Sequence, residues 1–273
     1  MNPFWLTDDE LSKVSEIIRT GDLINGKNVQ EFEHEFSNYI GSRYAIAVNS
    51  GTAALHLALL SSGISAGDEV ITSPLSFVST ANAALSIGAI PIFSDVNPST
   101  GNIDPFQIKQ VISNEVKAII GVHLYGFPFE VNDIREIAEK NNAVLIEDAA
   151  QAIGAEYRGI KVGQLGDIAC FSFFATKNLA TGEGGMITTN NKEIASKCRV
   201  LRSHGSIKKN IHEHLGYNYR MNEISAAIGR IQLTKIEKIN SARKQNAKIL
   251  NDILADNSNL DLPPNSDYIK HVY

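Results

Sequence analysis

The stretch "YAIAVNSGTAALHLALLSSG", from Tyr44 to Gly63, contains a complete strand–turn–helix unit. Its first five residues form an apolar run typical of a strand buried on both faces, and the polar residues "NSGT" interrupt that run. The segment that follows is long enough for a helix and ends at Gly63, a residue type common just after helix C-termini. A buried strand that leads directly into a helix predicts a parallel sheet covered by helices.

The same alternation continues along the chain. Strand-like runs are "DEVITSP", "IPIFSDV", "KAIIGVHLYG", "AVLIEDAA", "DIACFSFF" and "GMITTN". Helical patterns are "SFVSTANAALSIG", residues 105–113 and "VNDIREIAEKNN", and a long helix is expected from Asn222 to about Ala255. We therefore expect an α/β fold of three layers, with a mostly parallel central sheet flanked by helices. The last run, "YIKHVY", looks like the start of another strand.

Composition excludes several classes of protein. The chain has 273 residues, of which 43% are hydrophobic and 20% charged, and its net charge of −5 argues against a nucleic-acid or anionic membrane surface. Its two cysteines, Cys170 and Cys198, are too few for a disulfide framework and lack the spacing of a metal site. The start, "MNPFWLTDDELSKV", has no signal-peptide pattern and no run reaches membrane-spanning length, so we expect a soluble, cytoplasmic protein without bound metal.

Ligands of open α/β sheets bind beyond the carboxyl ends of the strands, so residues just after the apolar runs are candidates. Ser50, Gly51 and Thr52 connect the first strand to its helix, where free amides and the helix dipole favour a phosphate. A simple helix N-cap explains the same residues. Asp148 ends the run "AVLIED", so we expect a partly buried carboxylate with a cationic partner, either functional or structural. Glu147 faces the other side of the strand and is expected to be structural.

The stretch "SFFATKNLATGEGG", from Ser172 to Gly185, places Lys177 between an apolar run and a glycine-rich turn. A lysine in a dry site loses affinity for its proton and becomes an amine nucleophile, whereas a lysine in an exposed turn is simply solvated. The order of a phosphate site, an acid at a strand end and a lysine favours the first interpretation. Pyridoxal phosphate requires those three groups: an anion site, a carboxylate for its ring nitrogen and an amine for its aldehyde.

Five motifs in this order are "NSGTAALHLAL", "VHLYG", "IEDAAQAIGA", "FSFFATKNLATGEGGMITTN" and "GYNYRMNEISAAIG". Together they resemble the DegT/DnrJ/StrS sugar aminotransferases, which are fold-type I enzymes that use pyridoxal phosphate. The resemblance runs from about Trp5 to the end of the chain. It implies a pyridoxal-phosphate-binding large domain with an N-terminal arm over residues 1–235. Residues 236–273 would contain the long helix and the start of a smaller C-terminal α/β domain.

The resemblance also implies a role for each site residue. Lys177 would form the Schiff base with the cofactor, and Asp148 would pair with the pyridine nitrogen. Asn218, in "GYNYRM", would reach the phosphate of the neighbouring subunit, which implies a homodimer with shared active sites. The remaining residues expected to bind the cofactor are Gly51, Thr52, Ala53 and Ser172 at the phosphate, Phe77 stacked on the ring, and Gln151 beside it.

The activity implied by this resemblance is transfer of an amino group, with L-glutamate as donor, to a nucleotide-linked keto-sugar in amino-sugar biosynthesis. A second branch of the family has histidine at the lysine position and acts as a dehydratase, and Lys177 argues against that branch. The alternatives are another pyridoxal reaction on a sugar, such as dehydration, or a non-catalytic nucleotide-binding or regulatory module with the same fold. Members of the family usually continue beyond this length, so we expect a chain truncated within the small domain.

Overall fold

The computed structural model describes residues 6–24 and 26–273. Residues 1–5, at the start of the predicted large domain and its N-terminal arm, therefore lie outside the described residues. Asn25, in the loop "GDLINGKN", lies outside them too.

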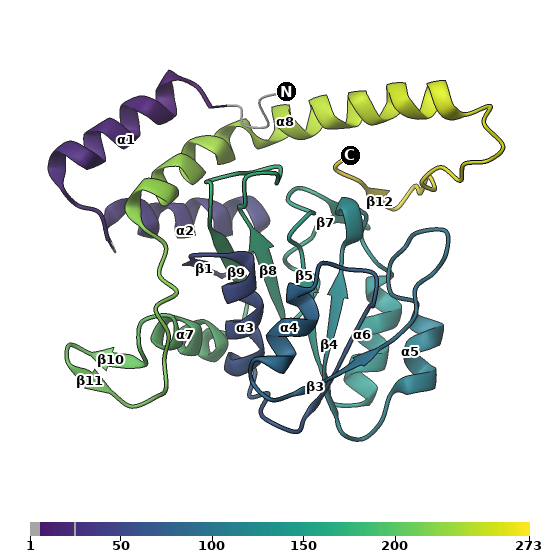
Figure 1. Cartoon of the computed structure of the whole chain (residues 1–273), viewed down its shortest axis with the longest axis horizontal. Helices are drawn as coiled ribbons and strands as arrows, with labels where there is room; N and C mark the ends of the chain where they lie inside the picture. Colours follow the sequence, from purple (N-terminus) through teal and green to yellow (C-terminus); the bar gives the residue numbers. More distant parts are fainter. Residues whose placement is uncertain (1–5, 25) are drawn as a thin grey trace.

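Helices and strands alternate through most of the chain (Figure 1). The helices are α1 (Asp8–Thr20), α2 (Lys27–Ile40), α3 (Gly51–Ser61), α4 (Ser79–Leu85), α5 (Pro105–Val111), the 3-10 helix η1 (Leu124–Gly126), α6 (Val131–Lys140), α7 (Lys192–Leu201) and α8 (Glu223–Leu254). The strands are β1 (Tyr44–Val48), β2 (Glu69–Thr72), β3 (Ile90–Phe93), β4 (Val116–Val122), β5 (Val144–Asp148), β6 (Glu156–Tyr157), β7 (Ile160–Lys161), β8 (Ile168–Ser172), β9 (Gly185–Thr189), β10 (Ser206–Lys208), β11 (Ile211–His212) and β12 (Ile269–Lys270).

A seven-stranded sheet in the order β1-β9-β8-β5-β4-β2-β3 forms the centre of the molecule. The neighbouring pairs from β8 to β3 are parallel, and β9 runs antiparallel to both β8 and β1. The expectation of a mostly parallel sheet is therefore confirmed. Because β1, β4, β5 and β8 run in the same direction, the segments that follow their carboxyl ends all lie at one edge of the sheet.

The two faces of the sheet carry separate hydrophobic cores, which confirms the expected three layers. Apolar side chains of α3, α4 and α7 pack on one face, and those of α2, α6 and α8 contribute to the core on the other. Strand β5 contributes alternate residues to both cores, with Leu145 on the α2/α6 side and Ile146 on the α3/α4 side. This period of two places Glu147 and Asp148 on opposite faces.

The long helix forms as expected, beginning after the N-cap Asn222, whose side chain accepts from the N–H of Ser225 at 2.8 Å. Two strand expectations need correction. Strand β8 ends at Ser172 and does not continue through "FF", because its partner β9 begins at Gly185, directly opposite Ser172. The run "YIKHVY" forms only the two-residue strand β12, which pairs with β6 outside the central sheet.

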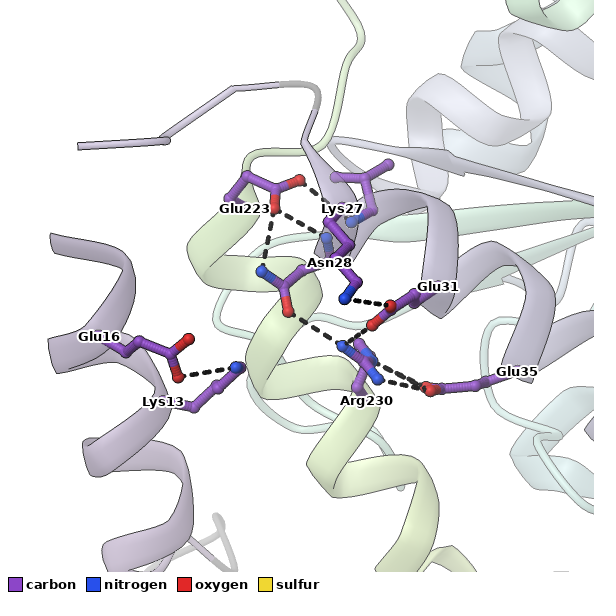
Figure 2. Close-up of polar contacts among 9 residues, drawn as sticks. Lys13, Glu16, Lys27, Asn28, Glu31, Glu35, Glu223 and Arg230 are labelled. Carbon is purple, nitrogen blue, oxygen red and sulfur yellow. Dashed lines mark hydrogen bonds and ion pairs between the residues drawn. The ribbon is translucent and has the colours of Figure 1, made fainter. Parts of the chain in front are cut away.

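Polar contacts join the start of α8 to the start of α2 (Figure 2). Glu223, only 1% exposed, accepts hydrogen bonds from the backbone N–H groups of Gly26, Asn28 and Val29 at 2.8 to 3.1 Å. Arg230, about two turns further along α8, pairs with Glu35 at 2.8 Å. A carboxylate at the N-terminus of α2 is favoured by the helix dipole. These contacts fix where α8 begins, and with it the segment that leads from the sheet edge into α8.

Within residues 6–24 and 26–273, none of the helices has both the length and the apolar character needed to cross a bilayer.

Candidate active site

A cavity of about 410 Å³ lies beyond the carboxyl ends of β1, β4, β5 and β8. This volume is within the range of small-molecule and cofactor sites. The predicted site residues that line it are Gly51, Thr52, Phe77, Asp148, Gln151, Ser172 and Lys177. Residues from widely separated parts of the sequence thus meet where an open α/β sheet binds its ligands.

A larger hollow of about 660 Å³ lies at the opposite edge of the sheet, beside the start of β5 and the residues that precede α7. Its lining includes Asn142, Asp167 and Lys197. This edge is formed by the amino ends of the parallel strands, which is not where such sheets bind substrates. The cavity that contains Lys177 is therefore the candidate active site.

The N-terminus of α3 forms one wall of the cavity. Ser50 is the N-cap, and its hydroxyl accepts the N–H of Ala53 at 3.1 Å. The N–H groups of Gly51 and Thr52 belong to the first helical turn, where the helix supplies no acceptor. A Cβ built on Gly51 would lie 2.8 Å from Cβ of Ser172, so a larger residue would close the space between the helix and β8. This wall combines free amides, the helix dipole and two hydroxyls, which is the donor set of a phosphate site.

Asp148, the last residue of β5, lies on the floor of the cavity and is 5% exposed. The hydroxyl of Thr80 donates to its Oδ2 at 2.8 Å, and the N–H of Ala150 donates to its Oδ1 at 3.2 Å. Burial raises the pKa of the Asp148 carboxyl, and the two hydrogen bonds and the charge of Lys177 offset this only in part. Among the described residues no side-chain cation forms an ion pair with Asp148, although the charge of Lys177 acts on it, so a functional cationic partner stays a prediction. The carboxylate can therefore still accept a charged donor from a ligand.

Lys177 lies in the loop after β8, where its backbone N–H donates to the carbonyl of Phe174 at 2.9 Å. Its side chain is half-buried and lines the cavity, which argues against a simple solvated lysine. Burial lowers the pKa of the Lys177 ammonium, and the charge of Asp148 opposes that shift. The net lowering of the pKa fits an amine that can lose its proton more readily than an exposed lysine.

Phe77 and Gln151 lie at the cavity from two other elements. Phe77 precedes α4 and is 72% exposed, so its ring is available to cover a planar ligand. The side-chain oxygen of Gln151 accepts the N–H of Tyr125 at 2.5 Å. Tyr125 has a φ of 52°, a left-handed conformation that few residues other than glycine adopt. The hydrogen bond from Tyr125 therefore joins a strained turn to the cavity wall.

Two of the predicted residues do not line the cavity. Ala53 is buried at 4% exposure, and its N–H is already bonded to Ser50. Asn218 is exposed and lies in an extended segment beside the end of β1, where the side chain of Asn49 donates to its carbonyl at 3.2 Å. Their roles in cofactor binding stay predictions.

Sequence reasoning missed Thr80, the donor that holds Asp148. Thr80 lies 68 residues before Asp148 and is presented by α4, so the contact depends on how α4 packs over the sheet. The only local signal was the presence of polar residues in "LSFVST", directly after a strand-like run.

The comparisons with known proteins agree with this arrangement. The sequence pattern of the DegT/DnrJ/EryC1/StrS aminotransferase family matches residues 5–273. The GDP-perosamine synthase of Caulobacter vibrioides is 46% identical over 81% of this chain and 60% of its own length. The UDP-N-acetyl-3-dehydro-alpha-D-glucosamine 3-aminotransferase of Acidithiobacillus ferrooxidans is 41% identical over 89% of this chain and 66% of its own length.

Among solved structures, the aminotransferase from Psychrobacter cryohalolentis superposes with a TM-score of 0.94 at 37% identity, covering 98% of this chain and 74% of that one. The chain thus spans less than two thirds of the two curated relatives and about three quarters of the solved one. The family match nevertheless includes all the residues of the candidate site. The chain belongs to the DegT/DnrJ/EryC1/StrS aminotransferase family.

Proposed function

We propose that this protein is a pyridoxal-phosphate-dependent aminotransferase that transfers an amino group from L-glutamate to a nucleotide-linked keto-sugar. The observation that carries the proposal is that Lys177 and Asp148 line the same cavity, at the N-terminus of α3. The names of two relatives, a GDP-perosamine synthase and a UDP-sugar 3-aminotransferase, support a nucleotide-sugar substrate. The amino sugar formed would be used in the biosynthesis of cell-surface polysaccharides or glycoconjugates. We propose that the protein acts in the cytoplasm.

The residues present fit pyridoxal phosphate. The free amides of Gly51 and Thr52, with the hydroxyl of Ser172, would hold the phosphate. Phe77 would stack on the ring, and Gln151 would lie beside it. When bound, this cofactor carries the amino group between the two substrates and accepts the electron pair released at the reacting carbon.

Asp148 and Lys177 would do different work at the bound cofactor. Asp148 would hold a proton on the pyridine nitrogen, because the positive charge of that nitrogen beside the carboxylate would favour the ionised form that burial alone disfavours. Lys177 would supply the amine that anchors the cofactor aldehyde and, once released, would carry the proton at the reacting carbon. Its lowered pKa suits this exchange, because a neutral amine is needed to accept a proton.

We further propose that two copies of the chain form a homodimer with shared active sites. Asn218 is exposed and does not line the cavity of its own chain, which supports a role at the phosphate of the other chain. We also propose the division into a large domain over residues 1–235 and a C-terminal unit over residues 236–273. This boundary would place most of α8 in the C-terminal unit.

The test is an assay of the cofactor-loaded protein with L-glutamate and a panel of UDP-, dTDP- and GDP-linked keto-sugars. We expect one nucleotide class to yield an amino sugar and 2-oxoglutarate in equal amounts, with none formed by Lys177→Ala. Loss of a sugar hydroxyl without amination would indicate the dehydratase. Tight binding of the nucleotide sugar with no turnover and no cofactor uptake would indicate a non-catalytic module. Either result would overturn the proposal.

A further inference from the structure

The segment "YNYR", residues 217–220, runs extended between β1 and the end of α7. On one side, the N–H of Asn49 donates to the carbonyl of Tyr219 at 2.9 Å. On the other side, the N–H groups of Tyr217 and Tyr219 donate to the carbonyls of Leu201 and Arg202 at 2.7 and 3.0 Å. The segment is thus held along its backbone from both sides, in a conformation whose side chains alternate.

The alternation separates Asn218 from its two tyrosine neighbours. Tyr217 and Tyr219 stack with ring centroids 5.0 Å apart and planes 11° from parallel, and both pack against the α3 side of the core. Asn218, between them, is exposed. The packing of the two rings therefore adds to the backbone hydrogen bonds that hold Asn218 between them.

His56 of α3 contacts both tyrosine side chains. Its ring meets Tyr217 edge-on with centroids 4.8 Å apart, and its Nδ1 lies 3.0 Å from the hydroxyl of Tyr219. His56 is 6% exposed, and its Nε2 is buried with no hydrogen-bond partner among the described residues.

The burial of His56 is not explained by the needs of the core. Its neighbours on α3, Leu55 and Leu57, are apolar, and an aliphatic residue at position 56 would avoid the cost of burying an imidazole. The contact with Tyr219 is the hydrogen bond that this imidazole makes. Burial lowers the pKa of His56, so the ring is neutral and offers Tyr219 one directional partner.

We propose that His56 is a positioning residue which, through Tyr219, fixes Asn218 for the active site of the partner subunit. The inference rests on the proposed function and on its shared active sites. Helix α3 would then serve two sites at once. Its N-terminus at Gly51 holds the phosphate of its own chain, and His56, about 7.5 Å further along the helix, orients the residue that reaches the phosphate of the other.

Tyr219→Phe isolates this contact, because it removes the hydroxyl and keeps the ring stack. Loss of one hydrogen bond of this kind should weaken pyridoxal phosphate binding by the homodimer about tenfold. The measurement is equilibrium titration of the apoprotein with pyridoxal phosphate, followed by fluorescence. His56→Leu is the second variant and should weaken binding in the same direction. Cofactor affinity equal to wild type in a folded Tyr219→Phe homodimer would overturn the proposal.

Hybrid dimers show which site the contact serves. Consider a hybrid of one Tyr219→Phe chain and one Lys177→Ala chain. If Tyr219 acts on the partner's site, both changes affect the site that lacks Lys177. The other site is then intact, so we expect one cofactor site of wild-type affinity and about half of wild-type activity per hybrid. If Tyr219 serves only its own chain, each site carries one lesion and neither recovers.

The control hybrid pairs an Asn218→Asp chain with a Lys177→Ala chain, with assembly verified by native mass spectrometry. Recovery in this control without recovery in the Tyr219→Phe hybrid would overturn the role of His56 and leave the shared sites standing. Failure of the control itself would overturn the shared sites, and the role of His56 with them. Turnover by the wild-type homodimer in the same preparation keeps both outcomes separate from a failure of the proposed activity.

Discussion

Glu147 and Asp148 are consecutive acids at the end of β5, and both are almost fully buried, but their surroundings differ. Glu147 faces the α2/α6 side, where its carboxylate lies 3.0 Å from Nε2 of His123. It also accepts three backbone N–H groups from the loop before β8, at 2.7 to 2.9 Å; these belong to Gly163, Leu165 and Gly166. Its capacity to accept hydrogen bonds is largely used within the chain.

Asp148 faces the α3/α4 side and, within the described part of the chain, accepts from Thr80 and the N–H of Ala150 alone. One face of the strand therefore carries a carboxylate that ties a loop to the sheet, and the other carries a carboxylate that can still bind a charged partner. The comparison teaches that burial of an acid does not distinguish a structural role from a functional one. The number of hydrogen-bond donors around the acid distinguishes the two roles, because buried polar groups with a purely structural role are normally satisfied within the chain.

The largest effect is expected on the Asp148 side, from Lys177, whose charge acts on Asp148. Lys177→Ala removes the amine and should lower transamination by at least about 10³-fold, since both attachment of the cofactor and proton transfer are lost. Steady-state kinetics on the cofactor-loaded protein measure this. Lys192→Ala, an exposed lysine at the start of α7, is the matched control and should keep wild-type turnover. Comparable losses in both variants would count against the site.

Asp148→Asn sharpens the comparison by changing charge and almost nothing else. Asparagine can hydrogen-bond to the ring nitrogen without stabilising its positive charge, so kcat should fall by about 10²- to 10⁴-fold. The folded-state pKa of Asp148 is raised, which means that its ionised form costs stability at neutral pH. The apoprotein of the variant should therefore unfold at the same temperature as wild type or higher. A variant with near-normal kcat would show that Asp148 is structural.

Glu147→Gln should give the opposite pattern. The amide keeps the shape but presents one oxygen to three N–H donors, so the free energy of unfolding should fall by about 3 kcal/mol. Cofactor affinity of the molecules that remain folded should stay near wild type, because Glu147 does not line the cavity. Chemical denaturation and cofactor titration measure the two quantities. If Glu147→Gln and Asp148→Asn lost stability and cofactor affinity in the same proportion, the contrast between the two faces would be wrong.

A third buried acid, Glu10 of α1, extends the comparison with the smallest effect. Burial alone would raise its pKa, but hydrogen bonds from Lys235, Thr7 and Gln232 outweigh burial and lower the pKa to about 2. A depressed carboxyl pKa stabilises the fold above the ordinary value of 4.5 and loses that contribution as the pH falls towards 2. After allowance for solvent screening this amounts to about 2 kcal/mol.

Glu10→Gln should therefore flatten the fall in stability between pH 4.5 and 2, as followed by urea unfolding at several pH values. Glu16→Gln is the matched control on the same helix, because its carboxylate is exposed and pairs with Lys13 of the same helix. An unchanged pH profile for Glu10→Gln would show that the contact of α1 with α8 does not depend on this charge.

Much of the fold could be predicted from the sequence, because the decisive signals were local. The apolar run before Asp148, the polar turn at Ser50 and the N-cap Asn222 each specify an element within a few residues. What could not be predicted depends on distant contacts. Glu223 accepts N–H groups from residues nearly 200 positions earlier, and no local pattern in the N-terminal segment indicates it.

The candidate site shows the same division. Lys177 and Asp148 could be predicted because each directly follows an apolar run, and such runs end at the edge of the sheet that binds ligands. Thr80 could not be predicted, because α4 brings it to Asp148 only after the helix has packed on the sheet. The proposed role of Asn218 involves a second chain, so neither a local pattern nor the packing of one chain can test it.

The central claim is that the Asp148 side of β5 faces a cofactor attached to Lys177. The most direct measurement is borohydride reduction of the pyridoxal-phosphate-loaded protein, followed by peptide mass spectrometry. The account predicts one modified peptide, with the pyridoxyl group on Lys177, in wild type and in Glu147→Gln, and none in Lys177→Ala. A pyridoxyl group on any other lysine, or no modification of a protein that has taken up the cofactor, would contradict it.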